Sequence, residues 1–310
     1  MNQDINTNTD SASKPNSEEP LVSIIVITYN SAKYVIETLE SARAQTCKNI
    51  ELIVSDDCST DDTINICTEW LNGNKKRFVR TELITVERNT GISANCNRGI
   101  KASVGVWIKL IAGDDILLRN CISDNIQFIQ QNPGVDLLFS EIETFGDRAD
   151  NHQELKDHKT PDFFYKTAKQ QFNQLVVKNR VFAPSSFIKL ALIKEIGGFD
   201  ERIKNLEDRP FWIKATKAGY KLFYMPIPTV GYRVHSGSIY NSHSDKLHNE
   251  KINLFYLYQL PNISFKNFLN IWHIYLSLHT FKNKNYKILK LLSPIWYSQK
   301  VSMLYKIEKQ

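Results

Sequence analysis

Three groups of polar residues each follow an apolar run, and their side chains are suited to binding a phosphorylated ligand. Thr28, Tyr29 and Asn30 follow V-S-I-I-V-I, Asp56 and Asp57 follow I-E-L-I-V-S, and Asp114 and Asp115 follow V-W-I-K-L-I-A-G. Carboxylates beside apolar segments are costly unless something positive meets them. Their oxygens are hard donors that suit Mg²⁺ or Mn²⁺. The acids therefore predict a divalent metal that bridges them to an anionic ligand.

Two common phosphate-binding loops are missing from the sequence. No G-x-G-x-x-G follows the first apolar run, and no G-x-x-x-x-G-K-S/T occurs. This disfavours a Rossmann dinucleotide site and a P-loop. Because few backbone amides are then available to cradle a phosphate, the sequence favours a metal-bridged phosphate ligand without a phosphate loop.

The elements that must position these residues alternate between strand and helix. Runs rich in β-branched residues predict strands at 22–28, 50–55, 82–87 and 106–111, and helical spacing predicts helices at 34–42, 63–71 and 92–102. This alternation predicts an α/β fold with a doubly wound, mostly parallel sheet. The crevice at the carboxyl ends of such strands binds ligands, and all three polar groups fall there.

Composition is that of a soluble protein with a sizeable core: 42% of the 310 residues are hydrophobic and 23% are charged. Residues 1–20 are polar, lack an apolar signal region and are predicted to be a disordered leader. The five cysteines show no metal-ligand spacing, which favours reduced thiols and a cytoplasmic location. No apolar run reaches the roughly 18 residues of a membrane span.

The positive charge lies in the tail, residues 236–310. The net charge of the chain is +6. This segment contains ten Lys, no Arg and three acids, interleaved with aromatic residues. A basic, aromatic, helical tail suits an anionic membrane surface, or it is the solvated face of packed helices. Nucleic acid is not the expected partner, because Arg, the preferred base reader, is absent from the tail.

A series of motifs runs along the chain in a fixed order. They are V-S-I-I-V-I-T-Y-N, I-E-L-I-V-S-D-D-C-S-T-D-D-T, R-N-T-G-I-S-A-N-C-N-R-G-I, A-G-D-D, G-G-F-D-E, L-E-D-R-P-F-W-I-K-A-T-K-A-G-Y and Y-R-V-H. In this order the sequence resembles a family 2 glycosyltransferase of the GT-A fold, from about Val22 to His235. The resemblance implies a GT-A domain at 21–235, with a nucleotide-binding half at 21–116 and an acceptor half at 117–235.

The resemblance assigns nucleotide contacts to the first half. Tyr29, with Thr28 and Asn30, is expected to line the base pocket, and Asp57 to accept a hydrogen bond from the uracil imide. Asn89, Gly91 and Asn97 lie in the stretch that follows the nucleotide. They are expected either to contact the ligand or to serve as turn and helix-start residues.

The metal motif departs from the family pattern. The usual D-x-D is Ala112-Gly113-Asp114 here, which leaves Asp114 as the implied main metal ligand. Asp115 is expected to bind the donor sugar or to brace the loop. His235 is expected to reach the metal or the diphosphate, with Arg233 on the same side of a strand. Relatives often carry Arg where this chain has Cys96, so the metal, Arg88 or Arg98 is expected to contribute more to nucleotide binding.

Glu207 and Asp208 match the acidic pair of the family at the start of a probable helix. The resemblance implies a general base, with Asp208 favoured over Glu207, whereas acids also cap helices. One base and direct displacement predict inversion at the anomeric carbon. Phe199 and Trp212 offer either a sugar-stacking face or core packing, and the helical pattern favours core for Trp212.

The resemblance thus implies an inverting transferase that uses a UDP-sugar, with galactose or N-acetylglucosamine favoured, and Mn²⁺ or Mg²⁺. The implied acceptor is a glycan or a lipid-linked saccharide in surface polysaccharide biosynthesis, at the inner face of the cytoplasmic membrane. Two alternatives stay open. One is a metal-dependent nucleotidyltransferase, although T-Y-N-S-A-K-Y lacks the expected phosphate loop. The other is a non-catalytic nucleic-acid-binding protein acting through the tail.

Overall fold

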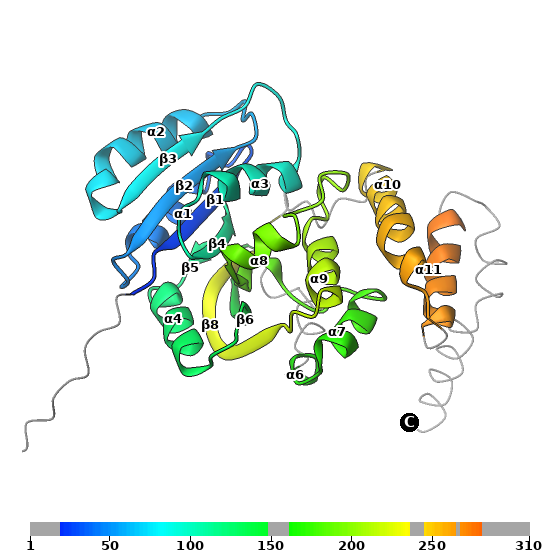
Figure 1. The fold of residues 1–310 in the computed structure, drawn as a ribbon. Coiled ribbons are helices and arrows are strands. Elements are labelled where there is room, and N and C mark those ends of the chain that lie inside the picture. The colour runs from blue at the N-terminus through cyan, green and yellow to red at the C-terminus, as the bar shows by residue number, and fades with distance from the viewer. Residues whose placement is uncertain (1–18, 148–160, 236–244, 265–266, 281–310) are drawn as a thin grey trace, which may run out of the picture.

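The computed structural model describes residues 19–147, 161–235, 245–264 and 267–280. Eight strands form one sheet in the order β3-β2-β1-β4-β7-β6-β8-β5 (Figure 1). The strands are β1 Val22–Thr28, β2 Ile50–Asp56, β3 Arg80–Ile84, β4 Trp107–Ala112, β5 Ile116–Leu117, β6 Leu137–Phe145, β7 Phe187–Lys189 and β8 Phe223–Arg233. Strands β1 to β4 pair in parallel, and β7 joins them to β6 by antiparallel pairing. The predicted mostly parallel α/β sheet is confirmed.

Helices cover both faces of this sheet. The α-helices of the described residues are α1 Val35–Arg43, α2 Thr63–Asn74, α3 Ile92–Ala102, α4 Cys121–Gln131, α6 Pro161–Phe164, α7 Ala168–Leu175, α8 Leu190–Glu195, α9 Asp208–Lys217, α10 Asp245–Leu254 and α11 Phe268–Thr280. The alternation of β1 separates two cores. Ile24 and Val26 pack with α1, α2 and α4, whereas Ile25 packs with α3 and α9.

The third strand differs from its prediction. It spans Arg80–Ile84 instead of residues 82–87, because its register is set by pairing Glu51 with Arg80 and Ser55 with Ile84. This edge strand is partly buried along its whole length, and the β-branched run that predicted it extends to Val86, beyond the last residue that pairs with β2. Helix α3, by contrast, has the predicted bounds.

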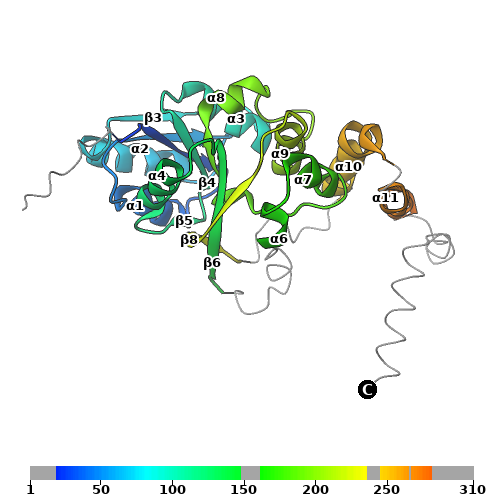
Figure 2. The same ribbon diagram turned by 60° about the horizontal axis from the view of Figure 1, so that its bottom comes forward.

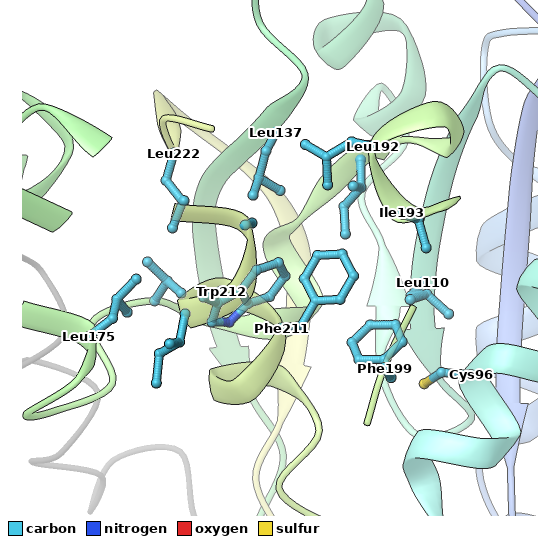
Figure 3. Close-up of a cluster of buried hydrophobic side chains, with 14 of the residues drawn as sticks. Cys96, Leu110, Leu137, Leu175, Leu192, Ile193, Phe199, Phe211, Trp212 and Leu222 are labelled. Carbon is cyan, nitrogen blue, oxygen red and sulfur yellow. The ribbon is translucent and has the colours of Figure 1, made fainter. Parts of the chain in front are cut away.

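A large aromatic and aliphatic cluster fills the second half of the chain (Figure 3). Trp212 is 1% exposed, as its helical pattern predicted, and Phe211 stacks on Phe199. Phe199 is also buried, so the alternative of a sugar-stacking face at this position is wrong. The tail contributes to the same cluster through four buried side chains, those of Leu254, Phe255, Tyr258 and Ile271.

The tail helices lie on the side of α7 and α9 in both ribbon views, with α10 next to α9 (Figure 2). Within the described ranges, no helix has the length and apolar character needed to span a bilayer. Residues 1–18 of the predicted leader and the aromatic segment 286–297 lie outside the described residues. All five cysteines are free thiols, in agreement with the sequence-based expectation.

Candidate active site

Asp57, at the carboxyl end of β2, is wrapped in hydrogen-bond donors. Its carboxylate accepts bonds from the backbone N–H groups of Thr90 and Gly91, from the Thr90 hydroxyl at 2.7 Å and from Nη2 of Arg98 at 2.6 Å. Burial alone would raise the pKa of Asp57, but these bonds outweigh it and lower that pKa below its ordinary value. Asp57 is therefore a fixed carboxylate that remains ionised at neutral pH.

The segment that follows β3 is organised around this carboxylate. Gly91 begins α3 with a φ of +96°, and a Cβ there would lie 2.7 Å from the Cβ of Lys204. Asn89 is exposed on the surface. The side chain of Asn97 is used inside the protein: it donates to the Phe199 carbonyl and to Glu201, and it accepts from the Phe199 N–H. Gly91 thus serves as the helix-start glycine.

The turn after β1 lies next to the Asp57 site. Thr28 donates its hydroxyl to Asp56 at 2.7 Å, and its carbonyl accepts the N–H of Asp57. Asn30 has a φ of +51° and accepts the N–H of Thr60. Between them Tyr29 is 49% exposed. Tyr29 thus presents an exposed ring directly after Thr28, whose carbonyl binds Asp57, and such a ring can stack on a flat base.

The Asp114 loop follows β4 and packs tightly on the turn after β1. A Cβ on Gly113 would lie 2.8 Å from Cγ2 of Thr28, so only glycine fits without a shift. Asp114 keeps a 34% exposed side chain, and its Oδ2 lies 3.0 Å from Nε2 of His235. These two residues, 121 positions apart, were both predicted as metal ligands and are brought together.

Arg233 and Asp115 fix the Asp114 loop in place through hydrogen bonds. Nε of Arg233 donates to the Asp114 carbonyl at 2.7 Å, and Nη2 pairs with Glu37 at 2.8 Å. The guanidinium also stacks against the rings of Tyr34 and Phe145. Asp115 is 2% exposed and accepts the backbone N–H of Arg233. Of the two roles considered for Asp115, the structure favours bracing of the loop.

The Asp114–His235 pair fits a weakly held divalent ion. It offers one carboxylate oxygen and one imidazole nitrogen, a donor set compatible with Mn²⁺. Within the ranges that the structure describes, no group of three or more His, Cys, Asp or Glu side chains could hold a metal. An ion at this pair would need further oxygen ligands from water or from a bound phosphate.

The acidic pair stands where the sequence predicted, at the start of a helix. Glu207 is the residue before α9, Asp208 is its first residue, and both are partly buried. Burial, followed by the charge of Asp208, raises the pKa of Glu207 to about 8. Burial also raises the pKa of Asp208, against the opposing hydrogen bond from Asn179. The pair therefore binds a proton more readily than isolated carboxylates do.

Asn179 is a site residue that the sequence analysis missed. Its Nδ2 donates to Oδ2 of Asp208 at 2.7 Å, and its own Oδ1 accepts the N–H of Arg180. The amide thus fixes the direction of the Asp208 carboxylate. No sequence signal marked Asn179, because it lies in a loop after α7, 29 positions from its partner.

The Cys96 departure has a structural explanation. Cys96 is 3% exposed and faces the hydrophobic cluster beside Phe199 (Figure 3). Burial raises the pKa of its thiol well above the ordinary value. Arg98 is a cation on the same helix that reaches Asp57. Its Nη1 donates to the Thr90 hydroxyl and its Nη2 donates to Asp57, while Nε has no partner among the described residues.

A family model described as glycosyl transferase family 2 matches residues 23–192, more than half of the chain. An uncharacterised glycosyltransferase of Methanocaldococcus jannaschii is 27% identical over 263 residues, 83% of this chain and 86% of the relative. The Escherichia coli protein WfaP, described as UDP-Glc:alpha-D-GlcNAc-diphosphoundecaprenol beta-1,3-glucosyltransferase, is 28% identical over 71% of this chain and 79% of its own length.

Solved structures show the same fold. Residues 1–349 of TarS from S. aureus, in complex with UDP, align with a TM-score of 0.56 at 20% identity, over 90% of this chain and 87% of that chain. The mannosyltransferase PcManGT from Pyrobaculum calidifontis, in complex with GDP-Man and Mn²⁺, aligns with a TM-score of 0.60 at 17% identity, over 92% and 76%. With the sheet and the site described above, the chain belongs to glycosyl transferase family 2 and is a glycosyltransferase.

Proposed function

We propose that this glycosyltransferase transfers a sugar from a UDP-sugar with inversion at the anomeric carbon. The observation that carries the proposal is the ionised Asp57 carboxylate beside the exposed Tyr29 ring. A carboxylate accepts the N3–H of uracil, and Arg98 donates to a neighbouring carbonyl oxygen. The complexes of TarS with UDP and UDP-GlcNAc support the choice of uridine.

The Asp114 loop would hold the diphosphate end of the donor. Asp114 and His235 would ligate Mn²⁺ or Mg²⁺, with Arg233 and Asp115 keeping Asp114 in place. When bound, such an ion acts as a Lewis acid that neutralises charge on the leaving diphosphate. The Mn²⁺ complex of PcManGT supports a divalent ion in this fold.

Asp208 would act as the general base. Asn179 aims its carboxylate, and the partly buried position keeps its pKa raised, so the group takes a proton from an acceptor hydroxyl at a smaller energetic cost. Direct displacement with one base favours inversion.

The donor sugar and the acceptor are proposals at a finer level. N-acetylglucosamine and galactose are the first sugars to test, with TarS supporting the former, and glucose follows because of WfaP. The diphosphoundecaprenol substrate in the name of WfaP supports a lipid-linked acceptor. This would bring the enzyme to the inner face of the cytoplasmic membrane.

Calorimetric titration with UDP, with Mn²⁺ and then with EDTA, tests the donor site. We expect binding that weakens in EDTA, is lost in Asp57→Asn and is unchanged in Asp162→Asn, a matched change at an exposed acid of α6. If neither EDTA nor Asp114→Asn changes the Kd for UDP, the proposed role of a metal in donor binding is wrong. Tighter binding of GDP or ADP would overturn the donor assignment, and pyrophosphate release from a nucleoside triphosphate would favour a nucleotidyltransferase.

Membrane contact through the tail has its own support and its own test. Phe268, Leu269 and Trp272 on α11 are between 42% and 50% exposed, and ten lysines accompany them in the tail. The protein should co-sediment with phosphatidylglycerol vesicles, and Trp272→Ser should reduce the fraction that co-sediments. Equal sedimentation with and without vesicles would contradict membrane contact.

A further inference from the structure

The segment 199–206, here called the base loop, leads directly into Glu207 and Asp208. On one side it is attached to α3 of the nucleotide-binding half. The Lys204 carbonyl accepts the N–H of Ser93 at 3.0 Å, the Ile203 carbonyl accepts the hydroxyl of the same serine, and Asn97 holds Phe199 through two hydrogen bonds. The donor-binding half therefore supports one side of the loop.

The tail holds the other side of the base loop. Glu250 on α10 accepts two hydrogen bonds from one residue: Oε2 from the backbone N–H of Asn205 at 2.8 Å and Oε1 from its Nδ2 at 2.5 Å. Glu250 is only 6% exposed. A buried carboxylate that loses such partners is strongly destabilised, so this contact fixes the position of Asn205 relative to α10.

Two more tail residues extend the contact. The hydroxyl of Tyr258 donates to Asp200 at 2.5 Å, near the start of the base loop. Nε2 of Gln259 donates to the Val176 carbonyl at 2.7 Å, and the same carbonyl accepts Nη2 of Arg209, the residue that follows Asp208. The tail thus contacts the loop at both ends and shares the Val176 carbonyl with the residue that follows the acidic pair.

We propose that Glu250 is a positioning residue for the transfer reaction, and that the tail segment 245–259 clamps the base loop so that Glu207 and Asp208 face the acceptor. Asn205 precedes Glu207 by two residues, so a movement at Asn205 is passed directly to the pair. Displacements of about 1 Å at a reacting group can cost on the order of 10²-fold in rate. The inference rests on the proposed role of Asp208 as the base.

The charges around Glu207 and Asp208 give the clamp a second measurable effect, on the pH dependence of kcat. The groups that face Glu207 and Asp208 are Glu250 on α10, Arg209 on α9 and the buried thiol of Cys96 on α3. Glu250 adds to the causes that raise the pKa of Glu207, after burial and Asp208. A residue that only held the tail in place would leave both the pH profile and kcat unchanged.

The test uses the full chain and, as donor, whichever of UDP-N-acetylglucosamine, UDP-galactose and UDP-glucose the unaltered chain turns over. Glu250→Ala should lower kcat by about 10- to 100-fold with donor KM changed less than twofold. Glu250→Gln should lower kcat less and move the acidic limb of the kcat profile to lower pH. Glu69→Gln, at an exposed acid of α2, is the matched control and should behave like the unaltered chain.

Asn205→Ala keeps the inference testable where Glu250→Ala folds poorly. It removes one of the two hydrogen bonds, and its effect on kcat should not add to that of Glu250→Gln, since the two residues act as one contact. Unchanged kcat in folded Glu250 variants, with activity abolished in Asp208→Asn, would overturn the clamp alone. Full activity in Asp208→Asn would overturn the base assignment, and the clamp with it.

Discussion

Asp57 is buried and Asp208 is partly buried, yet their surroundings shift their pKa values in opposite directions. Asp57 meets an arginine and three further hydrogen bonds, which lower its pKa. Asp208 meets another carboxylate, Glu207, and burial raises its pKa. One group is held as a permanent acceptor, while the other is ready to take a proton. Under the proposed function, a single residue type would support uridine binding in one region and base chemistry in another.

The largest expected effect comes from removing the base. Asp208→Asn keeps the hydrogen bond to Asn179 in reach but removes the proton acceptor, so kcat should fall about 10²- to 10⁴-fold. The Kd for UDP should stay the same, because the donor half is unaltered. A rate assay beside calorimetry measures both. A change in the Kd for UDP as large as the change in kcat would contradict the proposal that Asp57 serves binding and Asp208 serves catalysis.

The complementary experiment changes the surroundings of Asp57. Arg98→Ala removes the ion pair with Asp57, whose atoms are 2.6 Å apart, and leaves a buried carboxylate with fewer donors. Hydrogen bonds to charged groups contribute about 1.5–3 kcal/mol, so the Kd for UDP should rise roughly 10- to 100-fold. Turnover at saturating donor should change little. Lys101→Ala, at an exposed position in the last turn of the same helix, is the control.

The pH dependence sharpens the contrast. Because the pKa of Glu207 is raised to about 8 and Asp208 is raised with it, kcat should increase with pH up to about 8. The contribution of Asp57 to UDP binding should be constant over the same range, since the pKa of Asp57 is lowered. The stability that Glu207 contributes is present below its unfolded pKa near 4.5 and is lost as pH rises through about 8. Thermal unfolding between pH 5 and 9 checks this sign.

The first half of the site was predictable from the sequence because its residues are placed by the sheet itself. Asp57 and Asp114 follow buried parallel strands, so the topology brings them to one edge. Gly91 carries a helix-start signal that the structure bears out. His235 required the motif order, because its partner is 121 positions away.

The second half was less predictable because its contacts join distant loops. Asn179 and Glu250 lie 29 and 45 positions from the residues that they hold, and neither sits in a periodic pattern. Lys109, within the predicted strand at 106–111, is fully buried and donates to the Pro184 and Ser186 carbonyls, which no sequence pattern indicated. Such contacts depend on how loops meet, which local periodicity does not encode.

The smallest effect expected is at the start of the base loop. Tyr258→Phe removes one hydrogen bond to Asp200, but Arg202 still binds that carboxylate through both oxygens. The free energy of unfolding should fall by about 1 kcal/mol, and kcat by less than about fivefold. Denaturant unfolding beside the rate assay measures both. An effect on kcat larger than that of Glu250→Ala would move the main contact of the clamp from Asn205 to Asp200, away from the acidic pair.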